Sequence, residues 1–406
     1  MINTKRSNVV YLTGSPMLHL GGGYELRVAS IGRALSKQFN LTNVAICGTD
    51  WNCGHNIKHM DFRKLEFACE ESVSWGQRKP KAHLWGSRFD DAIMRSLLTR
   101  IDNIAPAWIY VGGIRVGAHA IALARAGHRL IVDMHNDEVN LAHQVLNTIP
   151  RRNWLNRKRF VLKLNRLRSC QTTLLNSAAS ISCCSDHDLL RFRQAGISAD
   201  KLVVVPNEIP PGCKVVPRQP TPEPTAIFVG TLNYPPNVEG LRWFNQHVAP
   251  LLLHRHPQFR LLVAGRNPSP ATTRELTRHA FIELHADSDN LSRLYERSNL
   301  SIVPLLSGGG TRIKLLEAAA FGLPSVSTSI GAEGLESLHS RCYWPGDTAS
   351  EFANNMMRCF AEPAKRHEIS NLAIETFGSA VIESALRHCV GVAMRQVPRH
   401  EQRNAG

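Results

Sequence analysis

The residues best suited to chemistry lie in a glycine-rich segment, PLLSGGGTRIKLLEAAAFGLPSVS, at positions 304–327. Its pattern predicts a strand, a glycine loop, a helix that stops at Gly322, and a second strand. Glycines let a backbone approach a phosphate closely, and a hydroxyl and two cations at the same helix end add hydrogen-bond donors. The predicted anion-binding residues are Gly309, Gly310, Thr311, Arg312 and Lys314.

Glu317 lies six residues after Thr311, which is about 9 Å along a helix at roughly 1.5 Å per residue. A carboxylate accepts two hydrogen bonds from vicinal hydroxyls, so one helix could hold both a phosphate and a ribose. The alternative is that Glu317 only pairs with Lys314 at three-residue spacing. Such a pair on an exposed face contributes only tenths of a kcal/mol, roughly.

A second glycine-rich segment, LHLGGGYELR at positions 18–27, places Gly22 and Gly23 directly before a predicted helix. Free backbone N–H groups and the helix dipole favour an anion there, although a flexible turn is the alternative. The segment lacks GxGxxG spacing, so a dinucleotide-dependent dehydrogenase is not supported.

The DHD at 186–188 follows Ser185 and is predicted to be a helix N-cap, not a metal-binding motif.

These loops must be positioned by the elements around them. Short β-rich runs such as SNVVYLTG (7–14), TAIFVG (225–230) and RLLVAG (260–265) alternate with helical stretches in both halves of the chain. This βαβ repetition predicts an α/β fold with two parallel sheets, each covered by helices on both faces. Ligands of such sheets bind beyond the carboxyl ends of the strands.

Seven prolines between positions 206 and 224 predict a linker, because proline sustains neither a helix nor a central strand. The predicted domains are 1–205 and 225–380, followed by a helix and polar tail at 381–406.

The composition, with 43% hydrophobic and 20% charged residues among 406, excludes wholesale disorder. No apolar run reaches the roughly 18 residues of a spanning helix. The apolar run that follows Lys5 and Arg6 is too short for the core of a secretory signal. We therefore expect a cytoplasmic protein whose ten cysteines, none in a CxxC pair, are reduced. One group has metal-ligand residue types without the paired spacing of a zinc site, so no metal is predicted. Its members are Cys47, Cys53, His55, His59 and Asp61.

The net charge of +15 is concentrated in the first half. Positions 1–205 hold 28 Lys and Arg against 15 Asp and Glu, which is +13, and the rest holds 20 against 18, which is +2. Eight basic and no acidic residues lie between 151 and 168, interleaved with apolar residues. This pattern predicts a helix suited to an anionic membrane surface, the alternative being a solvated helix face. The predicted membrane or acceptor patch comprises Arg151, Arg152, Trp154, Arg157, Lys158 and Arg159.

Three segments carry a family resemblance: FVGTLNYPPNVEGLRWF (228–244), LLVAGRNP (261–268) and SIVPLLSGGGTRIKLLEAAAFGLPSVSTSIGAEGL (301–335). They resemble the C-terminal domain of the group 1, or family 4, nucleotide-sugar glycosyltransferases, in the branch that builds bacterial exopolysaccharides and lipopolysaccharides. The first half is similar more faintly, through LGGGYELRVASIGRAL and IVDMHNDE (131–138).

The resemblance implies the GT-B architecture, two Rossmann-like domains facing across a cleft, with a last helix that crosses back onto the first domain. The second domain would bind a nucleoside diphosphate sugar, and the first a lipid-linked or glycan acceptor. Family enzymes retain the anomeric configuration and need no metal cofactor, because cations and helix N-termini neutralise the leaving diphosphate.

The resemblance also assigns roles to single residues. Arg312, Lys314 and the amides from Gly309 to Thr311 match phosphate-binding positions, and Glu317 matches the ribose-binding glutamate. Gly230 follows the first strand of the donor domain, and Gly22 and Gly23 are assigned to the donor as well. His135, at the end of a strand predicted in IVDMHNDE, matches a histidine that hydrogen-bonds the sugar or polarises the acceptor, and is the predicted catalytic residue.

Two departures from the family pattern concern the donor site. Gly309 replaces the first of two glutamates spaced eight residues apart, and Thr231 and Asn237 stand where many relatives have Arg and Lys. We therefore expect Arg312 and Lys314 to carry the diphosphate.

The expected activity is that of a retaining hexosyltransferase at the inner face of the plasma membrane. Two alternatives remain open at this point: another GT-B activity such as a nucleotide-sugar epimerase, or a non-catalytic polyanion-binding protein. Nucleic acid is not an expected partner.

Overall fold

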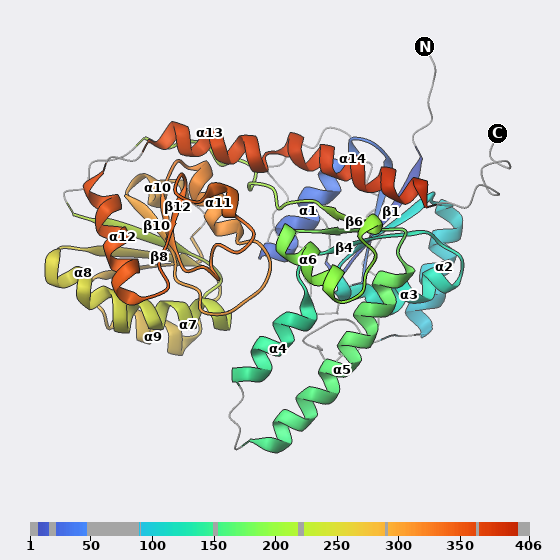
Figure 1. The fold of residues 1–406 in the computed structure, drawn as a ribbon, viewed down its shortest axis with the longest axis horizontal. Helices are drawn as coiled ribbons and strands as arrows, with labels where there is room; N and C mark the ends of the chain where they lie inside the picture. The colour runs from blue at the N-terminus through green and yellow to red at the C-terminus, as the bar shows by residue number, and fades with distance from the viewer. Residues whose placement is uncertain are drawn as a thin grey trace, which may run out of the picture. The chain divides into compact units, whose positions relative to one another are not determined.

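The computed structural model describes residues 7–15, 22–46, 89, 91–148, 153–217, 223–288, 291–362 and 365–396 (Figure 1). The chain divides into two compact units. The first comprises Met1–Pro206 and Ile382–Gly406, and the second comprises Asn207–Val381. Each unit contains one six-stranded sheet, and every strand pair in it is parallel, as the βαβ repetition predicts.

The sheet of the first unit has the strand order β2-β1-β3-β4-β5-β6. Its strands are β1 (Asn8–Thr13), β2 (Asn40–Ala45), β3 (Trp108–Gly112), β4 (Leu130–Met134), β5 (Ser180–Cys183) and β6 (Leu202–Val204). The helices that accompany them are α1 (Gly23–Ser36), α2 (Asp91–Ile104), α3 (Gly117–Arg125), α4 (Glu138–Thr148), α5 (Trp154–Ser177) and α6 (Asp186–Gln194).

Both faces of this first sheet are buried. Alternate residues of a strand point to opposite faces, so Val10 and Leu12 of β1 join one apolar cluster while Val9 and Tyr11 join another. Strands buried on both faces form near-continuous apolar runs, which is why β1 could be located in the sequence.

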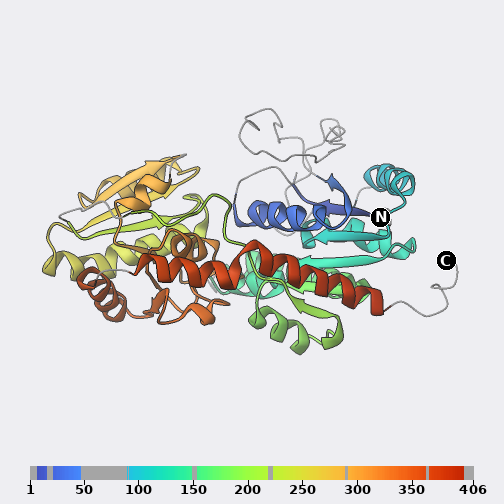
Figure 2. The same ribbon diagram turned by 90° about the horizontal axis from the view of Figure 1, so that it is seen from above.

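The C-terminal helix α14 (Ser379–Arg395) belongs to the first unit from Ile382 onward (Figure 2). Leu386 and Cys389 are fully buried in the same cluster as Tyr11 of β1. The ammonium of Lys37 lies 2.5 Å from the Glu383 carboxylate. The prediction that the last helix returns to the first domain is therefore confirmed.

The sheet of the second unit has the order β12-β11-β10-β7-β8-β9. Its strands are β7 (Thr225–Val229), β8 (Arg260–Gly265), β9 (Ile282–Ala286), β10 (Leu300–Val303), β11 (Ser325–Ser327) and β12 (Tyr343–Pro345). Its helices are α7 (Pro235–Trp243), α8 (Ala249–Arg255), α9 (Pro270–Thr277), α10 (Leu291–Glu296), α11 (Ile313–Ala320), α12 (Ala349–Ala361) and α13 (Arg366–Phe377), and a π-helical turn, Phe244–Val248, joins α7 to α8.

Two glycines let the elements of this second unit approach closely. A Cβ atom on Gly240 of α7 would lie 2.5 Å from the carbonyl oxygen of Pro304, just beyond β10. A Cβ atom on Gly265, at the end of β8, would collide with the backbone of Gly230 after β7. The carboxyl ends of β7, β8 and β10 therefore come together at one edge of the sheet.

The proline-rich segment is extended but fixed to the second unit along residues 207–217. Ile209 and Val216 are buried in that unit's apolar clusters. The Arg366 guanidinium donates hydrogen bonds to the carbonyl oxygens of Val216 and Ser298, at 3.2 Å and 2.7 Å.

Smaller features complete the fold. Ser185 caps α6 by accepting a hydrogen bond from the Asp188 N–H at 3.2 Å, as predicted. Among the described helices, none is both long and apolar enough to cross a bilayer. Within the described ranges, no three His, Cys, Asp or Glu side chains are grouped so as to hold a metal ion. The cysteine and histidine group from Cys47 to Asp61 lies outside the described residues.

Candidate active site

The glycine loop follows β10 and leads into α11, which confirms the predicted strand, loop and helix. Gly308 and Gly310 have φ angles of 130° and 70°, a region that side-chain-bearing residues rarely adopt. Arg312 occupies the N-cap position of α11. The loop therefore depends on its glycines and leads directly into a helix N-terminus, the geometry that favours an anion.

The Arg312 guanidinium lies over its own loop. Its Nη1 donates to the carbonyl oxygens of Gly309 and of Gly310, the latter at 2.7 Å. A Cβ atom on Gly308 would lie only 2.9 Å from Nη2. An anion at the loop would therefore compete with two carbonyl oxygens for this cation.

Lys314 reaches from α11 to the loop after β7. Its ammonium donates to Asn237 Oδ1 at 2.8 Å and lies 4.3 Å from the centroid of the Phe228 ring. Asn237 in turn donates to the carbonyl oxygen of Thr231 at 2.8 Å. A Cβ atom on Gly230 would lie 2.9 Å from the ammonium, so this glycine provides the space that Lys314 occupies.

Glu317 lies on the same helix and is half-buried. Burial raises the pKa of its carboxyl to about 7, while the Tyr295 hydroxyl and Lys314 favour the ionised form. Burial and, to a smaller extent, repulsion from Arg312 lower the pKa of Lys314 to about 7, while Glu317 favours its charged form. The hydrogen bond from Lys314 goes to Asn237, so the simple Lys314–Glu317 pair considered above is not the arrangement found.

In the first unit, His135 directly follows β4, at the strand end predicted for it. Two residues earlier, Asp133 is fully buried and accepts hydrogen bonds from Arg27 at 2.9 Å and 2.6 Å. Ser182 of β5 donates to the same carboxylate at 2.6 Å. The Nε2 atom of His135 lies 3.2 Å from Asp133 Oδ2.

Tyr24 of α1 packs against His135. Its ring stacks on His135, with centroids 4.6 Å apart and planes 25° apart. Its hydroxyl donates to the Gly112 carbonyl at 2.9 Å and accepts from the Gly14 N–H at 2.8 Å. The Arg115 guanidinium lies 3.8 Å from the centre of the same ring. Burial, with repulsion from two arginines, lowers the pKa of His135, although the nearby Asp133 carboxylate favours its charged form.

Gly22 and Gly23 also belong to the first unit, at the start of α1. The Gly22 N–H donates to the carboxylate of Glu25 at 2.9 Å. The N-terminus of α1 is thus capped by a carboxylate of its own helix, and the assignment of these glycines to the donor stays a prediction.

The structure therefore groups Gly230, Arg312, Lys314 and Glu317 in the second unit and places His135 in the first. Sequence reasoning missed their partners Asn237 and Tyr295 in the second unit. It also missed the residues around His135, which are Tyr24, Arg27, Asp133 and Ser182. A signal existed for Asp133, since an acidic residue within the apolar strand IVDM must find a partner when buried.

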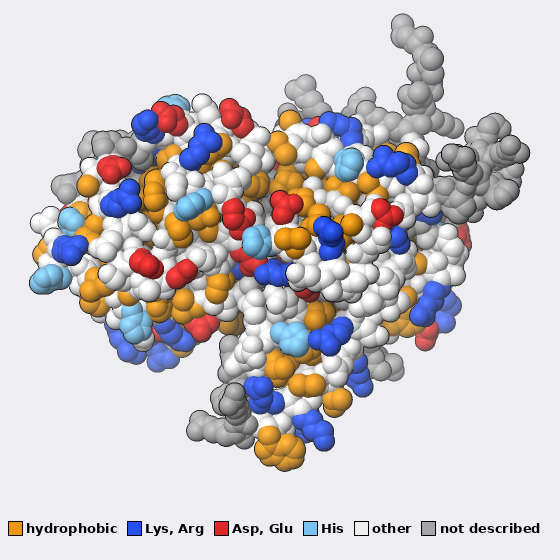
Figure 3. Space-filling model, viewed as in Figure 1, with side chains coloured by type: hydrophobic (Ala, Val, Ile, Leu, Met, Phe, Trp, Pro, Cys, Tyr) orange, Lys and Arg blue, Asp and Glu red, His pale blue; other side chains and the backbone are white. Residues whose placement is uncertain are grey.

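Most side chains in the first half of the basic helix α5 are exposed, and Figure 1 shows this end of α5 pointing away from the sheet of the first unit. All of its buried residues lie from Leu164 onward. Trp154, Leu155 and Leu162 are 62%, 53% and 57% exposed, and Lys158 and Arg159 are exposed beside them. Figure 3 shows hydrophobic and basic side chains intermixed at this end of α5. Arg151 and Arg152 lie outside the described residues, while Arg157 donates to the Leu146 carbonyl of α4 at 2.9 Å.

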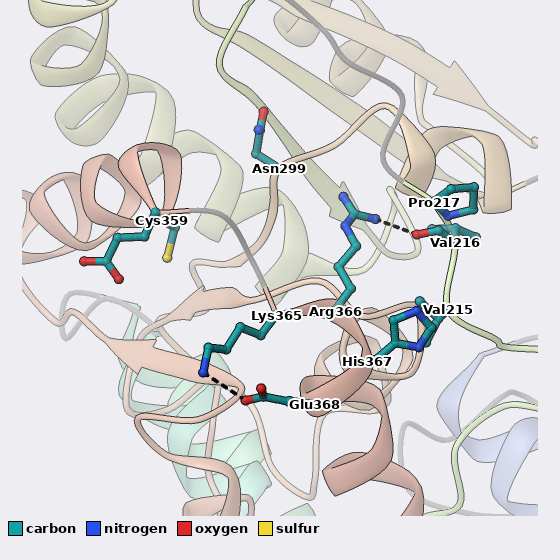
Figure 4. Close-up of a pocket in the computed structure, with 10 residues that line it drawn as sticks. Val215, Val216, Pro217, Asn299, Cys359, Lys365, Arg366, His367 and Glu368 are labelled. Atoms are coloured by element: carbon teal, nitrogen blue, oxygen red, sulfur yellow. Dashed lines mark hydrogen bonds and ion pairs between the residues drawn. The ribbon is translucent and has the colours of Figure 1, made fainter.

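A separate pocket of about 630 Å³ lies in the second unit (Figure 4). Its wall includes Asn299, which directly precedes β10, and Arg366 and Glu368 of α13. It therefore lies at the amino edge of the sheet, whereas the glycine loop follows the carboxyl end of the same strand. The pocket is therefore separate from the glycine loop.

The comparisons with known proteins agree with this geometry. Residues 223–362 match the family of group 1 glycosyl transferases, and this range contains the glycine loop, Lys314 and Glu317.

Two curated relatives come from bacterial capsule and exopolysaccharide systems. An uncharacterised 44.6 kDa protein of the cps region of Klebsiella pneumoniae is 33% identical over 121 residues, which are 28% of this chain and 31% of that protein. An exopolysaccharide phosphotransferase of Streptomyces coelicolor is 25% identical over 206 residues, 50% of this chain and 21% of that protein. The chain thus matches less than a third of the length of either relative.

Solved structures match nearly the whole chain. A sucrose-phosphate synthase from Thermosynechococcus elongatus has a TM-score of 0.65 at 14% identity and covers 98% of this chain and 100% of its own. Anabaena HepE in complex with UDP-glucose has a TM-score of 0.60 at 13% identity, and the match covers 95% of this chain and 99% of the HepE chain. The two parallel sheets and the returning helix are those of the GT-B fold, and the segment 223–362 within it is similar to the group 1 glycosyl transferases.

Proposed function

We propose that this protein is a retaining glycosyltransferase that moves a hexose from a nucleoside diphosphate sugar to a lipid-linked or glycan acceptor in bacterial surface polysaccharide synthesis. The observation that carries the proposal is the helix α11, which places two cations, a glycine loop and a partly buried carboxylate at one sheet edge. This edge lies within the range that matches the family.

The roles of the residues follow from their chemistry. The loop amides, Arg312 and Lys314 bind the diphosphate and stabilise the charge that develops on it as the sugar leaves. Glu317 accepts hydrogen bonds from the ribose hydroxyls. His135 hydrogen-bonds the sugar or the acceptor hydroxyl. No metal cofactor is required in this scheme, because the two cations and the helix N-terminus carry the neutralising charge.

The absence of the first family glutamate at Gly309 is compatible with this scheme. Arg312 and Lys314 supply the cationic groups of this scheme without a carboxylate at position 309. UDP-glucose is bound by the Anabaena protein with the same fold, and we propose a nucleoside diphosphate hexose as the donor here as well.

Calorimetry of nucleoside diphosphate binding tests the donor site. Replacing Arg312 or Glu317 by alanine is expected to weaken binding about tenfold each, because each loses one charge-assisted contact. Arg312 must also give up two carbonyl oxygens on binding, which limits its net effect. Arg274→Ala, an exposed arginine of α9, is the matched control and should leave affinity unchanged. Unchanged affinity in both site variants would mean that the donor assignment is wrong.

Product analysis separates a transferase from an epimerase. A transferase consumes the donor sugar when a polyprenyl-linked or glycan acceptor is present and transfers it with its anomeric configuration retained. An epimerase converts the nucleotide sugar without any acceptor. Donor binding without turnover of either kind would instead favour a non-catalytic subunit.

We also propose that the exposed half of α5, residues 154–163, binds the anionic inner face of the plasma membrane. Trp154, Leu155 and Leu162 would enter the headgroup region while the cations contact lipid phosphates. Replacing Lys158, Arg159 and Lys163 by glutamine should weaken binding to vesicles containing phosphatidylglycerol about a hundredfold, at about 1 kcal/mol per cation.

Vesicle sedimentation measures this effect. The charge-matched control replaces three exposed arginines of the second unit, Arg255, Arg274 and Arg278, by glutamine. It should retain most of the binding, since those residues do not adjoin the apolar side chains of α5. Equal binding of the native protein to phosphatidylcholine vesicles and to anionic vesicles would rule out the proposed surface.

A further inference from the structure

We propose that Asp133, oriented by Arg27 and Ser182, fixes His135 in the tautomer that carries its proton on Nε2, so that Nδ1 accepts a hydrogen bond from a substrate hydroxyl. Asp133 and Arg27 are then positioning residues for His135. The tautomer itself follows from the first unit alone, and only its consequence for turnover rests on the proposed function.

The carboxylate of Asp133 is ionised and cannot turn. Its Oδ1 accepts from Arg27 Nη2 and from Ser182 Oγ, both at 2.6 Å, and its Oδ2 accepts from Arg27 Nε at 2.9 Å. The facing guanidinium of Arg27 and the nearby imidazole of His135 hold the pKa of this buried carboxyl well below its usual range. Arg27 also donates to the Val205 carbonyl at 2.9 Å, which ties the guanidinium to the end of the sheet.

The position of this carboxylate decides which nitrogen of His135 holds the proton. Nε2 lies 3.2 Å from Asp133 Oδ2, and a lone pair on Nε2 would face an anionic oxygen. A proton on Nε2 turns that repulsion into attraction. The side chain of His135 is only 9% exposed, and neither ring nitrogen meets hydrogen-bond geometry with a described residue, so what distinguishes the two is that Nε2 has the Asp133 carboxylate 3.2 Å away.

The plane of the imidazole is set by a second contact. The Tyr24 ring stacks on it and is clamped at its hydroxyl by the backbone of Gly112 and Gly14. Gly113, with a φ angle of 82°, passes the ring edge, where a Cβ atom would lie 3.5 Å from His135 Cδ2. The contacts with Tyr24 and Asp133 therefore fix the orientation of the imidazole ring. Nδ1 is the ring nitrogen that lies away from the carboxylate and can bind a ligand.

This arrangement selects the chemistry of the ligand. A neutral imidazole with its proton directed at Asp133 offers only a lone pair at Nδ1, so its partner must be a hydrogen-bond donor. A hydroxyl of the transferred sugar or of the acceptor satisfies this requirement, whereas a phosphate oxygen does not.

Nitrogen NMR of the full chain, with ¹⁵N in the histidine rings, tests the inference. Long-range proton–nitrogen correlations report which ring nitrogen is protonated, and His135→Gln identifies the signals. The native protein should show His135 with Nε2 protonated. In Asp133→Asn, the amide oxygen stays with the two donors at the Oδ1 position, and the NH₂ group takes the Oδ2 position, where it faces His135 Nε2 and loses the hydrogen bond from Arg27 Nε. The proton should then move to Nδ1.

Turnover provides the second measurement. Asp133→Asn should lower kcat at least tenfold while the affinity for nucleoside diphosphate in the second unit changes less than twofold. Ser182→Ala removes one partner of Asp133 without touching His135, and should keep both the tautomer and most of kcat. Tyr24→Phe keeps the stacked ring and should also keep the tautomer.

The outcomes are distinguishable from those of the proposed function. A native His135 protonated on Nδ1, or equally on both nitrogens, overturns the inference even if donor binding is as proposed. The predicted tautomer and its switch in Asp133→Asn support the inference even in a chain that binds no nucleotide. If Asp133→Asn does not fold, the native spectrum and Ser182→Ala still decide between the tautomers.

Discussion

Replacing Asp133 by alanine is expected to lower the free energy of unfolding of the first unit by about 3–5 kcal/mol, because it leaves the Arg27 charge buried without its partner. Arg27 is only 3% exposed and Asp133 is fully buried, so water cannot replace the lost carboxylate. Urea unfolding followed by far-ultraviolet circular dichroism measures the change, and the transition of the first unit should shift while that of the second does not.

A double variant provides the control for this effect. Arg27→Met with Asp133→Leu removes both charges and should recover much of the loss, because an apolar pair of similar size avoids the desolvation of two ions. A loss below about 1 kcal/mol in Asp133→Ala would mean that the ion pair does not stabilise the unit.

The same ion pair predicts how stability depends on pH. The pKa of Asp133 is lower in the folded chain than in the unfolded chain, where it is about 4. Its contribution is therefore fully present above pH 4 and is lost as the pH falls further. In Asp133→Asn, the free energy of unfolding should therefore fall less steeply below pH 4.

The second large effect concerns Lys314. Lys314→Ala should weaken nucleoside diphosphate binding about tenfold to a hundredfold, because a hydrogen bond to a charged group contributes about 1.5–3 kcal/mol. The ammonium lies at a site that Gly230 leaves open, and it is held there by Asn237. Calorimetry at pH 7 measures the loss.

The pH dependence of binding gives a sharper test of Lys314. Its pKa is lowered to about 7, and the protonated form binds the diphosphate, so affinity should fall as the pH rises from 7 to 8. Glu317, whose pKa is raised to about 7, binds ribose hydroxyls when ionised, so affinity should also fall below pH 7.

Matched variants separate the decline in affinity above pH 7 from the decline below pH 7. Lys314→Arg stays charged and should abolish only the decline above pH 7. Glu317→Gln should abolish only the decline below pH 7. Constant affinity of the native protein between pH 6 and 8 would contradict the assignment of both groups.

Glu317 also predicts a stability effect of opposite sign to that of Asp133. Because its pKa is higher in the folded chain, its contribution is fully present below about pH 4 and is lost as the pH rises through 7. The half-buried carboxylate of Glu317 therefore lowers the free energy of unfolding as it becomes ionised.

The sequence alone was sufficient for features that depend on neighbouring residues. Apolar runs located the strands β1, β4, β7, β8 and β10, and the spacing of glycines, Arg312, Lys314 and Glu317 located the loop and helix α11. Ser185 was recognised as a cap in the same way. Local periodicity and backbone preference decide these features, so a short window contains the information.

The partners of these residues were decided only by the tertiary structure. Arg27 meets Asp133 across 106 residues, and Lys314 meets Asn237 across 77. In each case the strand order of a parallel sheet brings together loops and helix ends that are distant in sequence. Burial then imposes a pairing that isolated residue types do not reveal, because a charge inside the protein must be met by whichever polar group the fold places beside it.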